Sequence, residues 1–328
     1  MAGWAVDPWQ HTLEAILKNP GIAVMLGDVD VGKTTTATAI ANAAVRAGYR
    51  TVVVDTDIGQ SDIGPPATVG LAVAWRPVRQ MDQFPTAAAF FVGDTQPQFV
   101  YRYVVEGAVR SVAWARARGA EVIVVDTTGW VEGPAAVAAK ARKIRGIGAR
   151  HVVALQRRGE LEPILARLPE GIIRHRLRPS FQASARTRET RRIVRTHRFR
   201  QYFASARRHV VDLAAFPADR SAIYAGRQIP QACMLAEIPG PALRHLLVGL
   251  ADKEGWLAAV GSIVETAPPA QTVAIVAPLR SLAGVSGLQW GVLRVAPSGA
   301  EEGRLQWRRR HASPRRQYSS EEPAPKGT

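Results

Sequence analysis

Short apolar runs alternate with helical patterns along the first two thirds of the chain. Five runs are bounded by polar or glycine-containing turns and predict buried strands, at residues 22–26, 51–55, 87–92, 122–126 and 151–156. Between them, helical spacing or strong helix propensity predicts helices at residues 35–47, 99–118 and 133–145. Strands that alternate with helices in this way predict a mostly parallel sheet flanked by helices on both faces.

The two ends of the chain have a different texture. Residues 1–19 carry an amphipathic pattern, which predicts a helical arm packed on the domain that follows. Beyond residue 206, short apolar runs separated by Gly, Pro and polar turns predict a smaller C-terminal β-rich domain that extends to residue 310. Residues 311–328, rich in Ser, Pro, Arg and Glu, predict a disordered tail. The central domain then spans residues 20–205.

The sequence G-D-V-D-V-G-K-T, residues 27–34, lies between the first predicted strand and the first predicted helix. In this context the spacing G-x-x-x-x-G-K-T lets backbone N–H groups wrap a phosphate at the helix N-terminus. Lys33 would reach the β- and γ-phosphates, and the Thr34 hydroxyl would bind Mg²⁺. An ordinary glycine turn is the alternative, but few chance matches sit between a strand and a helix. The predicted ATP-binding residues are Gly27, Asp30, Val31, Gly32, Lys33, Thr34 and Thr35.

Carboxylates follow two of the predicted strands. Asp126 ends a run of four apolar residues, a pattern typical of a Mg²⁺ ligand in P-loop proteins, and Asp57 lies just beyond the strand that ends at Asp55. A carboxylate at position 57 could also accept the proton of an attacking hydroxyl. The alternative for Asp55 or Asp57 is loop capping, since Asp is favoured in turns. We predict a magnesium site made of oxygen ligands, from Thr34, Asp57 and Asp126, because the single cysteine, Cys233, excludes a cysteine-rich site.

Arginine dominates the charge of the chain. The formal net charge is +16, and the 43 basic residues divide into 37 Arg and 6 Lys. Residues 174–208 hold twelve Arg and one acid, Glu189. Such a segment is expected to repel itself unless a polyanion neutralises it, so a polyanionic partner is predicted. A compositional bias of the genome toward Arg is the alternative explanation.

Two further features point to a phosphoryl-transfer site. Arg191 and Arg195 lie four residues apart on one face of a predicted helix, from which they could neutralise a transferring phosphoryl group, although simple attraction to a phosphate backbone is the alternative. Trp130 follows Gly129 on a loop after a strand. An exposed indole there could stack on a nucleobase, whereas a core position is the alternative.

Five motifs in this order resemble the polynucleotide 5′-hydroxyl kinases. They are the P-loop at residues 27–34, D-T-D-I-G-Q at 55–60, I-G-P-P-A-T-V-G at 63–70, T-T-G-W at 127–130, and the Arg-rich helix that ends in Tyr202 and Phe203. Members of that family act in pre-mRNA, tRNA and ribosomal RNA processing. The likeness covers about residues 20–300 and is closest in type to the archaeal and bacterial members, which lack the N-terminal β-domain of the eukaryotic ones.

The resemblance implies an ATP- and Mg²⁺-dependent kinase that transfers the γ-phosphate to the 5′-hydroxyl end of RNA or DNA. It implies that Lys33 and Thr34 hold nucleotide and Mg²⁺, that Asp57 is the base, and that Gln60 belongs to the site loop. Thr127, Thr128, Gly129 and Trp130 would grip the terminal nucleotide as a clasp. Arg191 and Arg195 would be the catalytic arginines of a lid at about residues 174–205.

Two other functions fit parts of the pattern. One is a nucleotide-dependent RNA-binding assembly factor without phosphoryl transfer, and the other is a small-molecule kinase or ATPase, for which the Arg-rich segment would be needless. No apolar run approaches the roughly 18 residues of a membrane span, and the first 20 residues are too polar for a signal peptide. We therefore expect no membrane contact and a cytoplasmic location. Residue types alone do not decide between RNA and DNA.

Overall fold

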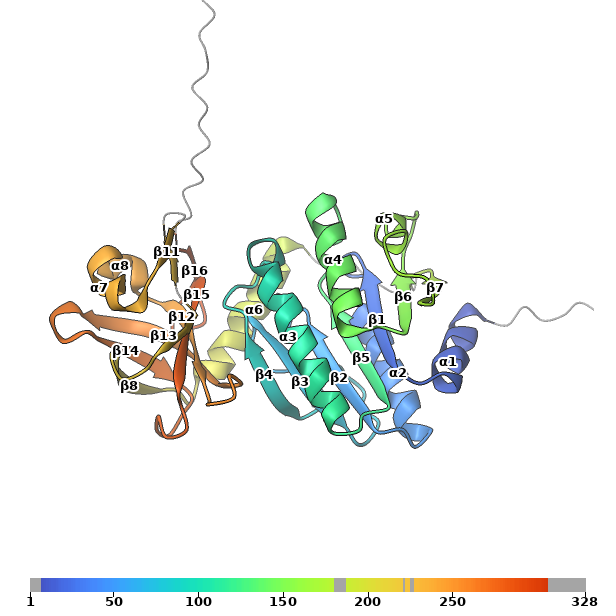
Figure 1. The fold of residues 1–328 in the computed structure, drawn as a ribbon, viewed down its shortest axis with the longest axis horizontal. Coiled ribbons are helices and arrows are strands. Elements are labelled where there is room, and N and C mark those ends of the chain that lie inside the picture. Colours follow the sequence, from blue (N-terminus) through green and yellow to red (C-terminus); the bar gives the residue numbers. More distant parts are fainter. Residues whose placement is uncertain (1–6, 180–186, 221, 225–226, 306–328) are drawn as a thin grey trace, which may run out of the picture.

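Two seven-stranded β-sheets frame the protein, and helix α6 lies between them (Figure 1). The structure, a computed structural model, describes residues 7–179, 187–220, 222–224 and 227–305. The P-loop follows strand β1 of the first sheet, and the second sheet is built from the C-terminal third of the chain. The predicted tail, residues 311–328, lies outside the described residues.

The first sheet has the strand order β4-β3-β2-β5-β1-β6-β7. Its strands are β1 Ile22–Gly27, β2 Thr51–Thr56, β3 Thr68–Ala74, β4 Thr86–Phe91, β5 Val122–Thr127, β6 His151–Leu155 and β7 Ile173–Leu177. Neighbouring strands are parallel, except that β3 pairs antiparallel with both β2 and β4. The predicted mostly parallel sheet is confirmed.

The sequence pattern missed strand β3. The Gly, Pro and small polar side chains of residues 56–70 are typical of a loop, but residues 68–70 begin β3. Gly70 lies inside that strand, where a Cβ atom would stand only 1.9 Å from the Ile63 carbonyl oxygen. The glycine therefore marks a close approach of two backbone segments rather than a turn.

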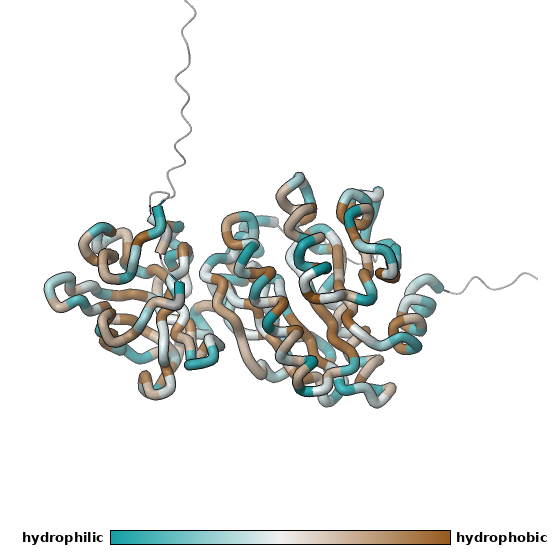
Figure 2. The backbone as a smooth tube through the Cα atoms, viewed as in Figure 1, coloured by the Kyte–Doolittle hydropathy of each residue, from teal (hydrophilic) through white to brown (hydrophobic). Residues whose placement is uncertain are grey.

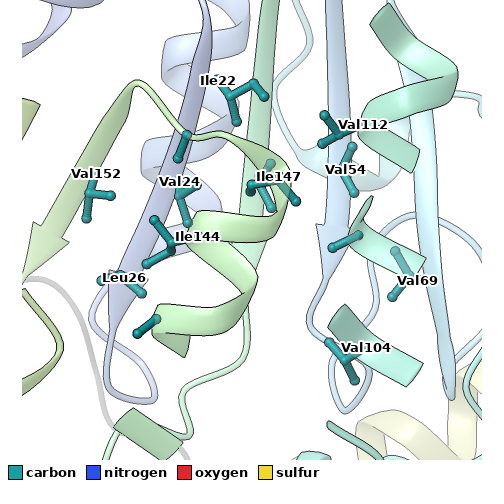
Figure 3. Close-up of a cluster of buried hydrophobic side chains, with 14 of the residues drawn as sticks. Ile22, Val24, Leu26, Val54, Val69, Val104, Val112, Ile144, Ile147 and Val152 are labelled. Atoms are coloured by element: carbon teal, nitrogen blue, oxygen red, sulfur yellow. The ribbon is translucent and has the colours of Figure 1, made fainter. Parts of the chain in front are cut away.

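Helices cover both faces of the first sheet. They are α1 Pro8–Lys18, α2 Lys33–Arg46, α3 Pro97–Ala117, α4 Pro134–Ile147 and the short α5 Glu162–Leu165, with the 3₁₀ turn η1 Met81–Gln83 before β4. Side chains of β1 alternate between the two faces, as a strand requires. Ile22, Val24 and Leu26 pack with α3 and α4 (Figure 3), whereas Ala23 and Met25 pack with α1 and α2. Figure 2 accordingly shows hydrophobic residues along the strands in the middle of this part of the molecule.

The second sheet is mainly antiparallel. Its strands are β8 Arg207–Asp212, β9 Ala218–Arg220, β12 Leu246–Ala251, β13 Leu257–Ala267, β14 Thr272–Ala277, β15 Gly287–Val295 and β16 Glu301–Arg304. The remaining elements are the hairpin β10 Ala222–Tyr224 and β11 Arg227–Ile229, and the short helices η2 Gln231–Cys233, α7 Met234–Glu237, α8 Gly240–Leu243 and η3 Pro268–Ala270. A separate apolar core fills this part. The predicted smaller β-rich domain is confirmed.

Helix α6, Arg188–Phe203, packs on both parts of the molecule. Its buried Phe199 and Phe203 belong to a cluster that joins Ala67 and Phe91 of the first part to side chains of the second sheet, namely Leu247, Val260, Leu293 and Val295. The Tyr202 hydroxyl accepts a hydrogen bond from the Val260 N–H at 2.8 Å. The predicted lid range of about residues 174–205 is thus divided, because its first part contains β7 of the first sheet.

The two sheets are joined by a direct backbone contact between the residues after β4 and strand β15. The Gly93 carbonyl accepts hydrogen bonds from the N–H groups of Val292 and Leu293, at 3.0 and 3.1 Å. Gly93 has φ 84°, and a Cβ on it would lie 2.6 Å from the Gly291 Cα. Beside this contact, Arg304 of β16 forms a bidentate ion pair with the fully buried Asp94. Because a Cβ atom would not fit between the two backbones, position 93 requires glycine.

Gly291→Ala should destabilise the protein. The new Cβ would stand 2.7 Å from the Leu247 carbonyl oxygen and 2.9 Å from the Gly93 oxygen, and backbone cannot move aside as a side chain can. We expect the free energy of unfolding, measured by urea denaturation, to fall by about 1–3 kcal/mol. Gly146→Ala inside α4 is the matched control, since its nearest contact would be Val109 Cγ2 at 3.3 Å and Ala favours helix. Equal effects of the two variants would contradict the junction argument.

A buried histidine pair makes stability depend on pH. His151 Nε2 donates to the Asn19 carbonyl at 2.7 Å, and its Nδ1 faces His175 Nε2 at 3.1 Å. Burial lowers the pKa of both rings, and burial together with the neighbouring His151 and His11 lowers that of His175 to about 4. Histidine in the unfolded chain becomes charged as the pH falls through roughly 6.5. In the folded state both rings stay neutral to a lower pH.

The contribution of the pair to stability should be constant well above the unfolded pKa of roughly 6.5 and decrease as the pH falls from there toward 4, because the unfolded chain then binds more protons. Between pH 7.5 and pH 5 the pair should account for about 1–2 kcal/mol of lost stability. The measurement is the difference between wild type and His175→Leu in urea midpoint at the two pH values. An identical pH dependence in both proteins would remove the pair as the cause.

Candidate functional site

The P-loop leaves the N-terminus of α2 open to an anion. Gly32 is the N-cap residue in a left-handed conformation, φ 88°, and no side chain caps the helix there. Asp30 also has a positive φ, 55°. A Cβ on Gly27 would lie 2.5 Å from Val31 Cγ2, so this glycine lets the loop close tightly over the strand end. Uncapped N–H groups and the helix dipole favour a phosphate at this point.

Lys33 and Thr34 begin α2 and project into the loop region. The buried Lys33 ammonium donates to the Asp28 carbonyl at 2.6 Å, across the loop. The Thr34 hydroxyl donates to Asp126 Oδ2 at 2.5 Å. A cavity of about 490 Å³ opens here, and its walls include Asp30, Gly32, Lys33, Thr34, Thr35, Asp57, Gln60, Asp62, Arg191 and Arg198. The structure thus brings Lys33 and Thr34, Asp57 and Arg191, from three separate segments, to one cavity, whereas the predicted metal ligand Asp126 is buried and does not line it.

Asp126 ends β5 directly behind the Thr34 hydroxyl. Burial raises its pKa to about 6, although Lys33 and the Thr34 hydrogen bond favour the charged form. The Thr127 N–H donates to its other oxygen at 2.8 Å. One carboxylate and one hydroxyl fit Mg²⁺, which takes oxygen ligands and usually keeps several waters and substrate phosphates. Within the described part of the chain, no three His, Cys, Asp or Glu side chains form a metal cluster, and Mg²⁺ does not need one.

Asp55 and Asp57 lie in different surroundings. The fully buried Asp55 accepts hydrogen bonds from the N–H groups of Asp57, Asp62 and Ile63, so it caps the loop. Burial raises the pKa of Asp55 well above its usual value, and the charges of Asp126, Asp62 and Asp57 raise it further. Asp57 also caps, since its Oδ1 accepts from Gly59 and Gln60 at 3.2 Å each, but it lines the cavity. Of these two carboxylates, Asp57 is the one that lines the cavity.

Helix α6 reaches the cavity through two arginines. Arg191 Nη1 lies 3.0 Å from Asp30 Oδ2 in the P-loop, and the Gln60 side chain donates to the Arg191 carbonyl at 3.2 Å. Arg198 pairs with Asp62 on the loop after β2. Residues 191, 194 and 198 share the face of α6 that lines the cavity.

Arg195 lies on the neighbouring stripe of α6. Its guanidinium makes two hydrogen bonds to Glu301 of β16, at 2.6 and 3.2 Å. The predicted catalytic role of Arg195 stays a prediction, and in this conformation the side chain attaches the helix to the second sheet. Arg198 was missed by the sequence reasoning, although its spacing of seven residues from Arg191 is the signal that places both on one face.

The T-T-G-W segment packs behind the P-loop. Thr127 and Thr128 are buried, and the Thr127 hydroxyl donates to the Met25 carbonyl at 2.8 Å. A Cβ on Gly129 would stand 2.6 Å from the Val29 nitrogen, so only glycine allows this approach. Trp130 is half-buried at the end of the segment. The predicted contacts of these four residues with a nucleotide remain predictions.

Two buried lysines of α4 support the carboxylate strands from behind. Lys140 Nζ donates to the Thr127 hydroxyl at 2.9 Å and to the Thr128 carbonyl and hydroxyl at 2.5 and 3.1 Å. Lys143 Nζ donates to the Thr56 hydroxyl at 2.6 Å, which in turn donates to the Asp126 carbonyl. Burial lowers the pKa of Lys140 far below its usual value, with help from the Lys143 charge, and lowers that of Lys143 to about 8.

The sequence reasoning did not single these lysines out. Three of the six lysines in the chain, Lys33, Lys140 and Lys143, are buried around this site. Two lysines three residues apart on an alanine-rich helix face were the available signal. The sequence reasoning also missed residues 79–82, which line the cavity and follow no recognisable spacing.

Lys140→Met should lower the free energy of unfolding by about 1–3 kcal/mol, because three buried oxygens lose their donor. Urea denaturation with circular dichroism measures the change. Arg142→Met, an exposed position on the same helix, is the control and should stay within about 0.5 kcal/mol of wild type. A Lys140→Met protein as stable as the control would show that the lysine does not hold this segment.

A mostly parallel α/β sheet with a P-loop, a carboxylate at the end of the adjacent strand and an arginine-bearing helix defines a P-loop nucleotide-binding protein. Residues 27–205 match the family described as mRNA cleavage and polyadenylation factor CLP1 P-loop. The match covers more than half of the chain, and the protein belongs to this family.

Similar proteins include several archaeal ones. The chain is 26% identical to the polyribonucleotide 5′-hydroxyl-kinase of Pyrococcus horikoshii, over 88% of this chain and 90% of that protein. It is 33% identical to the protein of the same name from Methanocaldococcus jannaschii, over 56% of this chain and 50% of that protein. The solved Clp1p–Pcf11p complex contains a chain with a similar fold, with TM-score 0.63 at 12% identity, covering 87% of this chain and 77% of that one. In the described part of the chain, no helix has the length and apolar character needed to cross a membrane.

Proposed function

We propose that the protein is an ATP- and Mg²⁺-dependent polynucleotide 5′-hydroxyl kinase. The observation that carries the proposal is the cavity in which Asp57 faces the P-loop residues Lys33 and Thr34 while Arg191 approaches from α6. Several relatives that align with most of this chain are named polyribonucleotide 5′-hydroxyl-kinases, which supports RNA as the acceptor. DNA is the second acceptor to test. We place the reaction in the cytoplasm.

In the proposed phosphoryl transfer, some residues bind the nucleotide and another removes the proton of the acceptor hydroxyl. Lys33 and the N–H groups of the P-loop hold the β- and γ-phosphates. Thr34 and Asp126, with Asp57 nearby, would hold Mg²⁺, which when bound neutralises charge on the phosphates. Asp57 accepts the proton of the 5′-hydroxyl as its oxygen bonds to the γ-phosphorus and the bond to the β-phosphate oxygen breaks. The products are a 5′-phosphorylated end and ADP.

Arg191 is the arginine best placed to neutralise the transferring group. It needs only to exchange Asp30 for a phosphoryl oxygen within the same cavity. Arg195 would first have to leave Glu301, so in this proposal it acts after Arg191 or as the anchor of the helix. In this proposal the segment from Thr127 to Trp130 also grips the terminal nucleotide, for which the half-buried Trp130 is the one aromatic side chain of the segment.

Transfer of labelled γ-phosphate from ATP to 5′-hydroxyl RNA and DNA oligonucleotides tests the proposal. Asp57→Asn keeps an oxygen for the Gly59 and Gln60 N–H groups but removes the base, so kcat should fall by about 10²–10⁴-fold with the fold intact. Lys33→Ala should reduce kcat by at least about 10²-fold. Asp212→Asn, on an exposed position of β8, is the control and should retain full activity.

Absence of transfer by the wild-type protein to either polymer, over a range of salt and Mg²⁺ concentrations, would refute the catalytic proposal. If ATP and RNA still bind under those conditions, the nucleotide-dependent assembly factor becomes the better description. Transfer to a small alcohol but to no oligonucleotide would instead favour a small-molecule kinase.

A further inference from the structure

The outer side of α6 carries arginines that the proposed site does not use. Three arginines of this helix already pair with carboxylates: Arg191 with Asp30, Arg195 with Glu301 and Arg198 with Asp62. Arg192 and Arg200 are exposed and make hydrogen bonds to backbone carbonyls, those of Glu301 and Ser298, at 3.5 and 3.3 Å. These two guanidinium groups keep further N–H donors directed at solvent.

Two hollows flank α6. The first, of about 950 Å³, lies between α6, β4 and the start of β13, and its walls include Pro65, Thr86, Gln201 and Leu257. The second, of about 400 Å³, lies between α6 and the turn before β16. Both hollows are lined by Ile193 and His197, which form the ridge between them, and 62% of Ile193 is exposed.

Shared walls join the first hollow both to the phosphate cavity and to the second hollow. The first hollow and the cavity have Asp82, Val194 and Arg198 in common. The second hollow is lined by Arg192 and Arg200, eight residues apart, or about 12 Å along the helix. A continuous track therefore runs from Asp57 through the first hollow, over Ile193 and His197, to two arginines without a carboxylate partner among the described residues.

We propose that this track holds the nucleotides of a single RNA strand that follow the phosphorylated end. The inference rests on the proposed kinase function and specifies its substrate as an oligonucleotide several residues long. Apolar walls and the exposed Ile193 suit the faces of bases, which lose water when they pack. The guanidinium groups of Arg192 and Arg200 suit phosphate oxygens, which they can bind through paired N–H donors. Glu189 is the one carboxylate that lines the second hollow among the described residues, whereas two arginines line it.

The expected signature is a dependence on acceptor length. Kinetics are compared for a nucleoside 3′-monophosphate, a dinucleotide and a 12-nucleotide RNA, with wild type and with Arg192→Ala/Arg200→Ala. The KM for the 12-mer should rise about 10-fold in the double variant, because two phosphate contacts are lost. The KM for the monophosphate and all kcat values should not change, since neither arginine touches the phosphate cavity.

Salt dependence gives an independent readout. The slope of log KM for the 12-mer against log salt should decrease in magnitude by about 1.4 in the double variant, at about 0.7 per lost contact with a single strand. Arg142→Ala/Arg145→Ala, two exposed positions on α4, is the matched control with the same change of net charge and should reproduce wild type. Equal increases of KM for the monophosphate and the 12-mer, or an equal effect of the control, would overturn the proposal.

Binding separates this inference from the kinase proposal. Fluorescence anisotropy with a labelled 12-mer measures affinity whether or not transfer occurs. A 10-fold weaker dissociation constant in the Arg192→Ala/Arg200→Ala protein supports the track even if the protein transfers no phosphate. An unchanged dissociation constant contradicts the track even if the protein proves to be an active kinase.

Discussion

The backbone contact between Gly93 and strand β15 is the constraint on which the rest of the arrangement depends. It fixes the second sheet against the end of β4, and the buried Asp94–Arg304 pair reinforces it. Helix α6 packs into the resulting angle through Phe199 and Phe203, since their cluster contains side chains from both parts. The arginines of α6 therefore reach the P-loop because the second sheet holds the helix there. None of the described residues of the C-terminal domain lines the phosphate cavity, but the domain sets the position of α6, which forms one wall of it.

Charge around the cavity is balanced by pairing across segments that are far apart in sequence. Asp30 and Asp62 each face an arginine of α6, and Asp126 lies between Thr34 and the positive charge of Lys33. From behind the sheet, Lys143 reaches the Asp126 carbonyl through Thr56. Carboxylates elsewhere in the chain also pair with five of the twelve arginines of the Arg-rich segment, so part of its charge is neutralised within the molecule: these are Arg176, Arg191, Arg195, Arg198 and Arg208.

The sequence predicted the parallel strands and the P-loop because both depend on local signals, apolar runs and a fixed glycine spacing. It did not predict β3, whose Gly70 looks like a turn residue until the neighbouring Ile63 backbone is in view. Asp57 and Asp126 were found because each lies at the carboxyl end of an apolar run, Asp57 just after β2 and Asp126 as the second-last residue of β5. Arg198, Lys140 and Lys143 were not, since their roles depend on partners more than ten residues away. Tertiary contacts also separated Arg191 from Arg195, which the helical period alone places on one face.

Arg191 can change partner without movement of its helix. The Arg191–Asp30 pair is partly exposed, with 20% and 17% of the two side chains accessible, and an ion pair in contact with water contributes little net stability. The buried aromatic side chains of α6, together with the Tyr202 hydroxyl, hold the helix independently of that pair. A phosphoryl oxygen arriving at the P-loop thus competes for one guanidinium and leaves the anchoring contacts in place. In the proposed reaction, helix α6 would therefore be a fixed support, and the part that responds to a nucleotide would be the Arg191 side chain.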